Sequence, residues 1–212
     1  MSVSERLAQE DRILREIRMT LSSYRSVSPL GETRRRGVVY ASSPITSGLR
    51  LFNLMRREGV KSPDDLKQSP LFRKEVVDAN ISNGEKFGNE LRRNGYPLVI
   101  VPGAFFAKGW TQGHYMSLWR QVIIRFSSKI AFNENWQWSS GCVEEFLISI
   151  ENDKIMLNSD TKRIETPRLA SEMIRGAIDQ IDDWGFDAKP LYDIWRQIEL
   201  ALETKTKLRT GT

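Results

Sequence analysis

Cysteine and histidine are almost absent from this chain of 212 residues, which has Cys142 and His114 as its single examples. One thiol cannot close an internal disulfide, and one thiol with one imidazole cannot supply the ligand cluster of a structural zinc site. We therefore expect no disulfide and no metal site. Cys142 is interpreted as a small packed residue.

Long apolar runs are missing as well. No segment approaches the ~20 apolar residues that a membrane span needs, and the opening MSVSERLAQEDR lacks the apolar stretch of a secretion signal. The composition, 40% hydrophobic and 28% charged, is typical of one globular domain with a sizeable core. We expect a cytoplasmic protein that makes no membrane contact.

The familiar nucleotide-binding signatures are also missing. The chain has neither G-x-G-x-x-G nor G-x-x-x-x-G-K-[ST], so dinucleotide binding and P-loop chemistry are disfavoured. The net charge of +5 suits an anionic partner. Its one dense basic run, Arg34 to Arg36 in SVSPLGETRRRG, has no interleaved aromatic residues and is interpreted as a solvated linker. Nucleic acid is therefore not the expected partner.

Strand-like and helix-like segments alternate along the chain. The strand candidates are β-rich or continuously apolar and are bounded by turn residues; they are GVVYASS (37–43), YPLVIVPG (96–103), KIAFNEN (129–135) and KIMLN (154–158). YPLVIVPG is expected to be buried on both faces. Helical periodicity marks 4–23, 76–94, 112–126, 142–152, 167–184 and 190–204, while the two prolines in 61–75 indicate an insertion or a broken helix.

This alternation predicts an α/β fold: a small doubly wound, flavodoxin- or Rossmann-like parallel sheet with helices on both faces. We expect an N-terminal helix and linker over 1–36, an α/β domain over 37–160, and helices over 161–212 packed on the same domain or on a partner subunit. In such sheets ligands bind beyond the carboxyl ends of the strands. The loops at these ends are Tyr40 to Gly48, Pro102 to Gln112 and Asn133 to Gly141.

The adjacent carboxylates Glu144 and Glu145 follow the third of these loops. On a helical wheel Val143, Phe146 and their i+4 neighbours form the buried stripe, and Glu145 lies almost opposite to it. The pattern alone favours a solvated Glu145, with Glu144 as a capping-box acid three residues after Gly141. A glutamate in the first turn can nevertheless lean into the strand-end crevice, because helical side chains point toward the N-terminus.

Two motifs together resemble the nucleoside 2-deoxyribosyltransferase superfamily, in particular its nucleoside 5′-monophosphate N-glycosidase branch. The first is the strand ending in Tyr40 followed by SSPITSG, which places Ser43 where the family usually has glycine. The second is NWQWSSGCVEE (135–145), which keeps the family's W-x-x-S-x-G-(A/C)-x-x-E spacing. The resemblance covers about residues 38 to 150.

The resemblance implies oligomerisation as a homodimer or larger assembly, no cofactor, and cleavage of the bond between a base and its sugar. Glu145 matches the family's nucleophile and Tyr40 matches the tyrosine that orients it. A glutamate nucleophile would hold the sugar covalently and then release it to water or to another base. The residues that match the substrate-binding positions are Ser42, Ser43, Pro44, Ile45, Thr46, Ser47, Gly48, Trp136, Ser139 and Gly141.

Ser139 refines the expected substrate. The family's transferases for free nucleosides typically have aspartate six residues before the nucleophile, whereas its monophosphate hydrolases have serine there. A hydroxyl at a helix N-terminus can donate to a phosphate, while a carboxylate would repel it. Ser139 or Ser140 is equally suited to cap the helix, which is compatible with phosphate binding. The expected substrate is a nucleoside 5′-monophosphate or a nucleoside.

One departure from the family leaves alternatives open. Many members assist the leaving base with an aspartate, but TQGHYMSLWRQ (111–121) contains no carboxylate. His114 or Gln112 can substitute as a donor near neutral pH, and Trp136 or Trp138 can close the pocket. The main alternative function is a nucleotide-sensing module with the same fold and no turnover. A weaker alternative is nucleic-acid binding through the basic run, with the steep salt dependence of such binding.

Overall fold

A four-stranded parallel sheet lies at the centre of the chain. The computed structural model describes residues 3–27, 37–164 and 166–210. The strands are β1 (Val38–Ser42), β2 (Leu98–Ile100), β3 (Lys129–Phe132) and β4 (Ile155–Leu157), in the spatial order β2-β1-β3-β4. All three pairings are parallel, so the carboxyl ends of the strands meet at one edge of the sheet.

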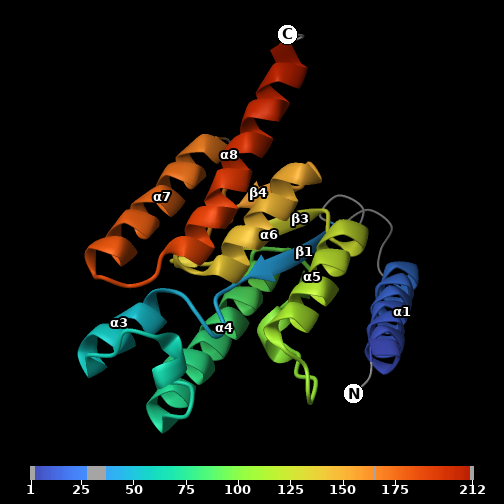
Figure 1. Ribbon diagram of the computed structural model, residues 1–212. Coiled ribbons are helices and arrows are strands. Elements are labelled where there is room, and N and C mark those ends of the chain that lie inside the picture. The colour runs from blue at the N-terminus through green and yellow to red at the C-terminus, as the bar shows by residue number, and fades with distance from the viewer. Residues whose placement is uncertain (1–2, 28–36, 165, 211–212) are drawn as a thin grey trace.

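Helices fill the intervals between the strands and both ends of the described chain (Figure 1). The α-helices are α1 (Val3–Val27), α3 (Leu49–Glu58), α4 (Ala79–Arg93), α5 (Gln112–Phe126), α6 (Ser140–Glu151), α7 (Pro167–Asp183) and α8 (Lys189–Thr210). Shorter 3-10 turns are η1 (Pro63–Asp65), η3 (Pro102–Ala104) and η4 (Trp136–Trp138), and η2 (Phe72–Asp78) is a π-helix. The fold is therefore mixed α/β with a parallel sheet.

The strand register divides the core into two hydrophobic clusters. Tyr40 pairs with Ile130, and both belong to the larger cluster, which α5 and α6 complete. Ala41 pairs with Ala131, and both belong to the smaller cluster, which Phe87 and other residues of α4 complete. Because successive strand residues point to opposite faces, this register places helices on both sides of the sheet.

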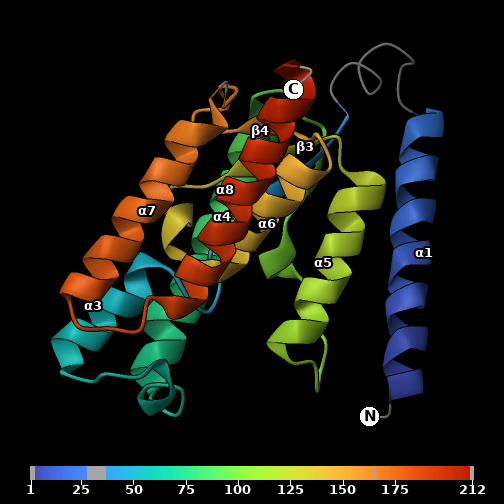
Figure 2. The ribbon, with the colours of Figure 1, turned by 45° about the horizontal axis from the view of Figure 1, so that its top comes forward.

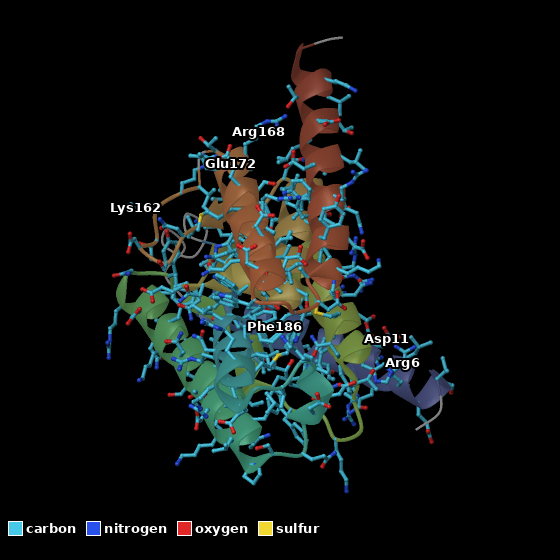
Figure 3. The ribbon with its side chains drawn as sticks, turned by 60° about the vertical axis from the view of Figure 1, so that its left-hand side comes forward. Arg6, Asp11, Lys162, Arg168, Glu172 and Phe186 are labelled. Atoms are coloured by element: carbon cyan, nitrogen blue, oxygen red, sulfur yellow. The ribbon has the colours of Figure 1, made fainter. Side chains whose placement is uncertain are left out.

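The C-terminal helices share the larger cluster. Ile174 of α7 and Ile198 of α8 are both fully buried there, and Figure 2 shows α8 lying along α6 with α7 beside it. Figure 3 shows the labelled side chains Arg168 and Glu172 on the outer surface of α7, where both are exposed. The turn before α8 carries Phe186, whose ring stacks on Phe52 of α3 with centroids 5.9 Å apart. The helices after residue 161 thus pack on the same chain.

Two sequence expectations need correction or refinement. YPLVIVPG contains β2, but this strand lies at the edge of the sheet and its residues are only partly buried. The expected burial on both faces is wrong because the chain places β1, and not β2, between two neighbours. The segment 61–75 is indeed a broken helix: η1 and the start of η2 lie within it.

At the N-terminus, α1 lies along α5 at the side of the molecule away from α7 (Figures 1 and 2). The basic run Arg34 to Arg36, interpreted from the sequence as a linker, lies outside the described residues. Within the described ranges, none of the helices has the length and apolar character required to cross a membrane.

Candidate active site

A buried glutamate lies at the carboxyl edge of the sheet. Glu145 of α6 is only 6% exposed. The Tyr40 hydroxyl donates to its Oε1 over 2.5 Å, and the Ser42 hydroxyl donates to its Oε2 over 2.5 Å. Both donors belong to β1, where they are two residues apart and fully buried. A strand presents side chains at i and i+2 on the same face, so β1 offers two hydroxyls to one carboxylate.

The solvated environment expected for Glu145 from the helical wheel is wrong. In α6 the residues Cys142, Val143 and Glu145 to Ile150 are all buried, so the helix has no solvated face along its middle. It packs against α8 and α5, and its residues Glu145 and Phe146 contact Tyr40 of β1 and Phe132 of β3. A helix covered from several directions is apolar nearly all round, and Glu145 is the charged residue within that buried stretch. It is satisfied by hydroxyls in place of water.

Burial is also the main influence on the ionisation of this glutamate. It raises the pKa of Glu145 to about 7, against the opposing effect of the hydrogen bonds from Ser42 and Tyr40. Burial and the nearby Glu145 charge raise the pKa of the Tyr40 phenol well above its usual value, so Tyr40 stays a donor. Burial raises the pKa of the Cys142 thiol to about 12, which leaves it protonated and unreactive at neutral pH.

Glu145 lines a pocket of about 490 Å³, which we call the carboxylate pocket. All three loops expected at the strand ends contribute residues to it: Ser43 and Ile45 to Ser47 from the first, Pro102, Gly103, Phe105, Phe106, Trp110 and Gln112 from the second, and Ser139 and Gly141 from the third. The helices η2, α4 and α5 complete its walls. Parallel strands that end at one edge bring such distant loops together, which is the usual place for a ligand in an open α/β sheet.

The loop after β1 is held in place by two devices. Asn80 of α4, itself 6% exposed, donates its amide to the carbonyl oxygens of Ile45 and Ser47, each over 3.1 Å. Gly48 has φ of +92°, and a Cβ there would approach Pro44 within 3.0 Å. Both the left-handed backbone and the lack of space require glycine at this position. The loop is therefore a fixed part of the pocket.

Hydroxyl groups from two loops meet at the N-terminus of α6. The Ser47 and Ser139 hydroxyl oxygens lie 2.8 Å apart. Ser139 is the N-cap of α6 and accepts a hydrogen bond from the Cys142 backbone N–H over 3.5 Å. The capping role expected for Glu144 is wrong, because a helix capped by Ser139 has Cys142 at the capping-box position.

Aromatic residues form another part of the pocket wall. Phe105 packs edge-on against Trp110, Tyr115 and Trp119, with ring centroids 5.6 to 6.3 Å apart. The Tyr115 hydroxyl accepts from the Ala107 backbone N–H over 2.9 Å, which ties this loop to α5. The pocket therefore has a hydroxyl-rich side and an aromatic side, and Glu145 lies on its floor.

Several residues expected at the site lie elsewhere. His114 does not line the carboxylate pocket; its Nδ1 accepts the Thr111 backbone N–H over 3.1 Å in a capping box. Gln112, the other candidate donor, does line it. Trp136 is buried against Phe132, and Trp138 stacks on Trp184 with centroids 5.4 Å apart.

Within the β1 loop, the expected substrate-binding residues divide into two groups. Ser43, Ile45, Thr46 and Ser47 line the pocket, as do Ser139 and Gly141 from the later loop. Ser42 instead donates to Glu145 from behind, and Pro44 and Gly48 shape the loop without lining the pocket. The side chain of Ser42 therefore serves the carboxylate.

Sequence reasoning missed two polar residues of the site. Asn80 and Arg73 lie in the long segment interpreted only as broken or continuous helix, and neither belongs to a motif. A polar Asn80 between apolar neighbours of an otherwise amphipathic helix was the available signal. No sequence signal pointed to Arg73, because its position at the pocket depends on the π-helix.

A second cavity, of about 610 Å³, opens at the ends of β3 and β4. We call it the amide crevice, because Asn133, Asn135, Gln137 and Asn158 line it. Its charged residues Glu134 and Arg163 are exposed. Across the described residues, no group of three or more His, Cys, Asp or Glu side chains is arranged to hold a metal ion.

The site thus combines a buried carboxylate with two hydroxyl donors, a hydroxyl-rich loop and an aromatic wall. Comparisons with family models, with curated proteins and with solved structures find no match for this chain, so its function is inferred from this geometry and from the two motifs.

Proposed function

We propose that the protein cleaves the N-glycosidic bond of a nucleoside 5′-monophosphate or nucleoside, or exchanges its base, with Glu145 as nucleophile. The observation that carries this proposal is the carboxylate of Glu145, which is buried, held by Tyr40 and Ser42, and exposed to a pocket at the strand ends. Perturbed carboxylates in clefts are characteristic of catalytic sites. The strand order and the helices on both faces also support the doubly wound fold of the superfamily that the motifs resemble.

In the proposed reaction a Glu145 oxygen bonds to C1′ as the bond from C1′ to the base nitrogen breaks. The bonding electron pair leaves with the base, which takes a proton from water or from a donor in the pocket. Water or a second base then displaces the carboxylate from C1′ and regenerates it. Tyr40 and Ser42 hold the carboxylate in one orientation, which spares part of the entropy cost of reaching the transition state.

The two sides of the pocket suit the two ends of such a substrate. The aromatic wall around Phe105 offers faces and edges for a base. Ser47 and Ser139 at the N-terminus of α6 offer hydroxyl donors and a positive dipole end for a phosphate. A monophosphate is therefore favoured over a free nucleoside.

The direct test is incubation of the purified protein with matched pairs of nucleoside monophosphates and nucleosides, covering both ribose and deoxyribose. Released base is separated by chromatography and quantified over time. We expect release from at least one monophosphate and slower release from its parent nucleoside. A Glu145→Gln preparation serves as the blank, and equal release from the blank would exclude Glu145 as nucleophile.

A second candidate function is a nucleotide-binding module without turnover. The observation in its favour is that Glu145 is the sole carboxylate among the described residues lining the pocket, so no second acid assists the leaving base. Binding of a monophosphate by calorimetry, together with no base release over the whole panel, would support this candidate. Homo-oligomerisation stays a prediction in both cases, to be measured by analytical ultracentrifugation.

A further inference from the structure

An arginine that belongs to neither motif lies at the carboxylate pocket. Arg73 and Glu145 are the two charged residues among the described residues that line it. They differ in depth: Glu145 is buried, whereas the Arg73 side chain is 69% exposed. The pocket therefore has a carboxylate on its floor and a guanidinium at its mouth. This pairing of charges suits a substrate with a reactive neutral centre and an anionic end.

The position of Arg73 depends on an unusual element. It lies in η2, a seven-residue π-helix, and π-helical turns are rare and frequent at functional sites. Arg73 Nε contacts Asp78 Oδ1 at 2.7 Å, five residues along the chain, the hydrogen-bonding separation of a π-helix. Buried Val76 and Val77 anchor this turn to the core, so the base of the Arg73 side chain is fixed.

The same helical segment extends along the β1 loop. Arg73, Val77 and Ile81 line the pocket at intervals of four residues, and Asn80 holds the loop carbonyls. Arg73 thus lines the same pocket as Thr46 and Ser47, on the helical segment that Asn80 fastens to the β1 loop. Its partner Asp78 is 51% exposed, and an exposed ion pair contributes little to stability. A doubly charged phosphate can therefore displace Asp78 from the guanidinium.

We propose that Arg73 selects for a phosphorylated substrate by exchanging its contact with Asp78 for a contact with the substrate phosphate. This inference rests on the proposed function for the identity of the substrate. It assigns Arg73 to substrate binding and Asp78 to holding Arg73 before the substrate binds. Arginine suits this role because its planar fork of N–H donors matches phosphate oxygens.

The test compares deoxyadenosine 5′-monophosphate with deoxyadenosine in wild type and in Arg73→Gln. We expect Arg73→Gln to lower kcat/KM for the monophosphate by about 10- to 100-fold, mostly through KM, as the loss of one charge-assisted contact implies. The nucleoside should change by less than about twofold, since it lacks the phosphate. Asp78→Asn should lower KM for the monophosphate by about two- to fivefold, because an exposed competing pair is removed.

Arg57→Gln is the matched control. Arg57 is 53% exposed, forms a 2.8 Å ion pair with Glu75 of the same π-helix, and does not line the pocket. The Arg57→Gln substitution removes one positive charge from the same region at a residue that does not contact the substrate. Equal effects of Arg57→Gln and Arg73→Gln, or an equal loss for monophosphate and nucleoside in Arg73→Gln, would overturn the inference.

A binding measurement separates this inference from the proposed function. Calorimetric titration of the same two compounds into Glu145→Gln, with and without Arg73→Gln, needs no turnover. Selective loss of monophosphate binding in the double variant supports the role of Arg73 even if wild type releases no base. Unchanged monophosphate binding in the double variant overturns it even if wild type is active.

Discussion

The carboxylate pocket and the amide crevice both open at the carboxyl edge of the same sheet, yet they differ in the chemistry of their walls. The amide crevice is the larger, at about 610 Å³ against about 490 Å³. Its polar groups are amides and exposed charges, whereas the smaller pocket has a buried glutamate held by two hydroxyls. The carboxyl ends of the strands therefore produce both cavities, but the chemistry that each cavity can support depends on the side chains buried in its walls.

Both cavities have a buried polar group without a hydrogen-bond partner among the described residues: Asn133 Nδ2 and Gln137 Oε1 in the amide crevice, and Ser43 Oγ in the carboxylate pocket. The two cavities differ in that one of them holds a paired carboxylate. In the carboxylate pocket both oxygens of Glu145 have a donor. A carboxylate with assigned donors is oriented, and orientation is what a nucleophile requires.

The largest expected effect concerns Glu145. Glu145→Gln should reduce base release on the order of 10³-fold or more and remove any covalent glycosyl adduct, because it removes the proposed nucleophile. Glu144→Gln is the matched control, since Glu144 is the adjacent carboxylate and does not line the pocket. Chromatography and intact-protein mass spectrometry measure the two outcomes. Similar losses of base release in both variants would contradict the assignment of Glu145 as the nucleophile.

The next effect concerns the hydroxyl side of the pocket. Ser139→Asp should cost about 10- to 100-fold in kcat/KM for a monophosphate relative to its nucleoside, because it brings a carboxylate against the phosphate. Ser140→Asp adds the same charge one residue later, at a position that does not line the pocket. An unchanged substrate ratio in Ser139→Asp, measured by competition kinetics, would limit Ser139 to its capping role.

A smaller effect is expected for Tyr40→Phe, and it appears in the pH profile. In the proposed mechanism Glu145 must be ionised to attack, so kcat/KM should rise with pH through about 7, where burial places the pKa of Glu145. The Tyr40 hydroxyl donates to the charged form and lowers that pKa. Removal of this hydroxyl should shift the rising limb to higher pH and lower kcat/KM about tenfold at pH 7.

Ser42→Ala removes the other donor and should shift the limb in the same direction. The fold of both variants is checked by thermal unfolding, since each leaves one carboxylate oxygen without its hydroxyl donor. A limb that stays in place, or moves to lower pH, would show that the titrating group is not Glu145.

The fold was largely predictable because its elements have strong local patterns. The expected helix 112–126 coincides with α5, and the expected strand KIAFNEN (129–135) contains β3, which ends at Phe132. Burial was harder to predict: Glu145 looked solvated on a wheel that considers α6 alone, but the sheet, α5 and α8 cover it from several sides. The prediction that β2 is buried on both faces failed for the same reason, since strand order is a tertiary property.

The candidate site was predictable where the family resemblance assigned roles to residues of the two motifs. Tyr40 was expected to orient Glu145, which lies 105 residues further along the chain, and the hydrogen bond between them is present. Asn80 and Arg73 were not found, because their roles depend on the way α4 and a π-helix pass the β1 loop. A local pattern cannot encode such a passage, so these residues become visible only in the assembled structure.

The smallest effect should come from the amide crevice. Arg163→Gln removes the positive charge that lines this cavity, while the backbone bridge between Arg163 and Leu157 is unaffected by the side chain. If the chemistry resides only in the carboxylate pocket, kcat/KM should change by less than about twofold, as is typical of an exposed charge away from the substrate. Arg73→Gln provides the comparison, because it removes one exposed arginine from the other cavity. A loss above about tenfold in Arg163→Gln, with unfolding temperature unchanged, would mean that the substrate or its products contact both cavities.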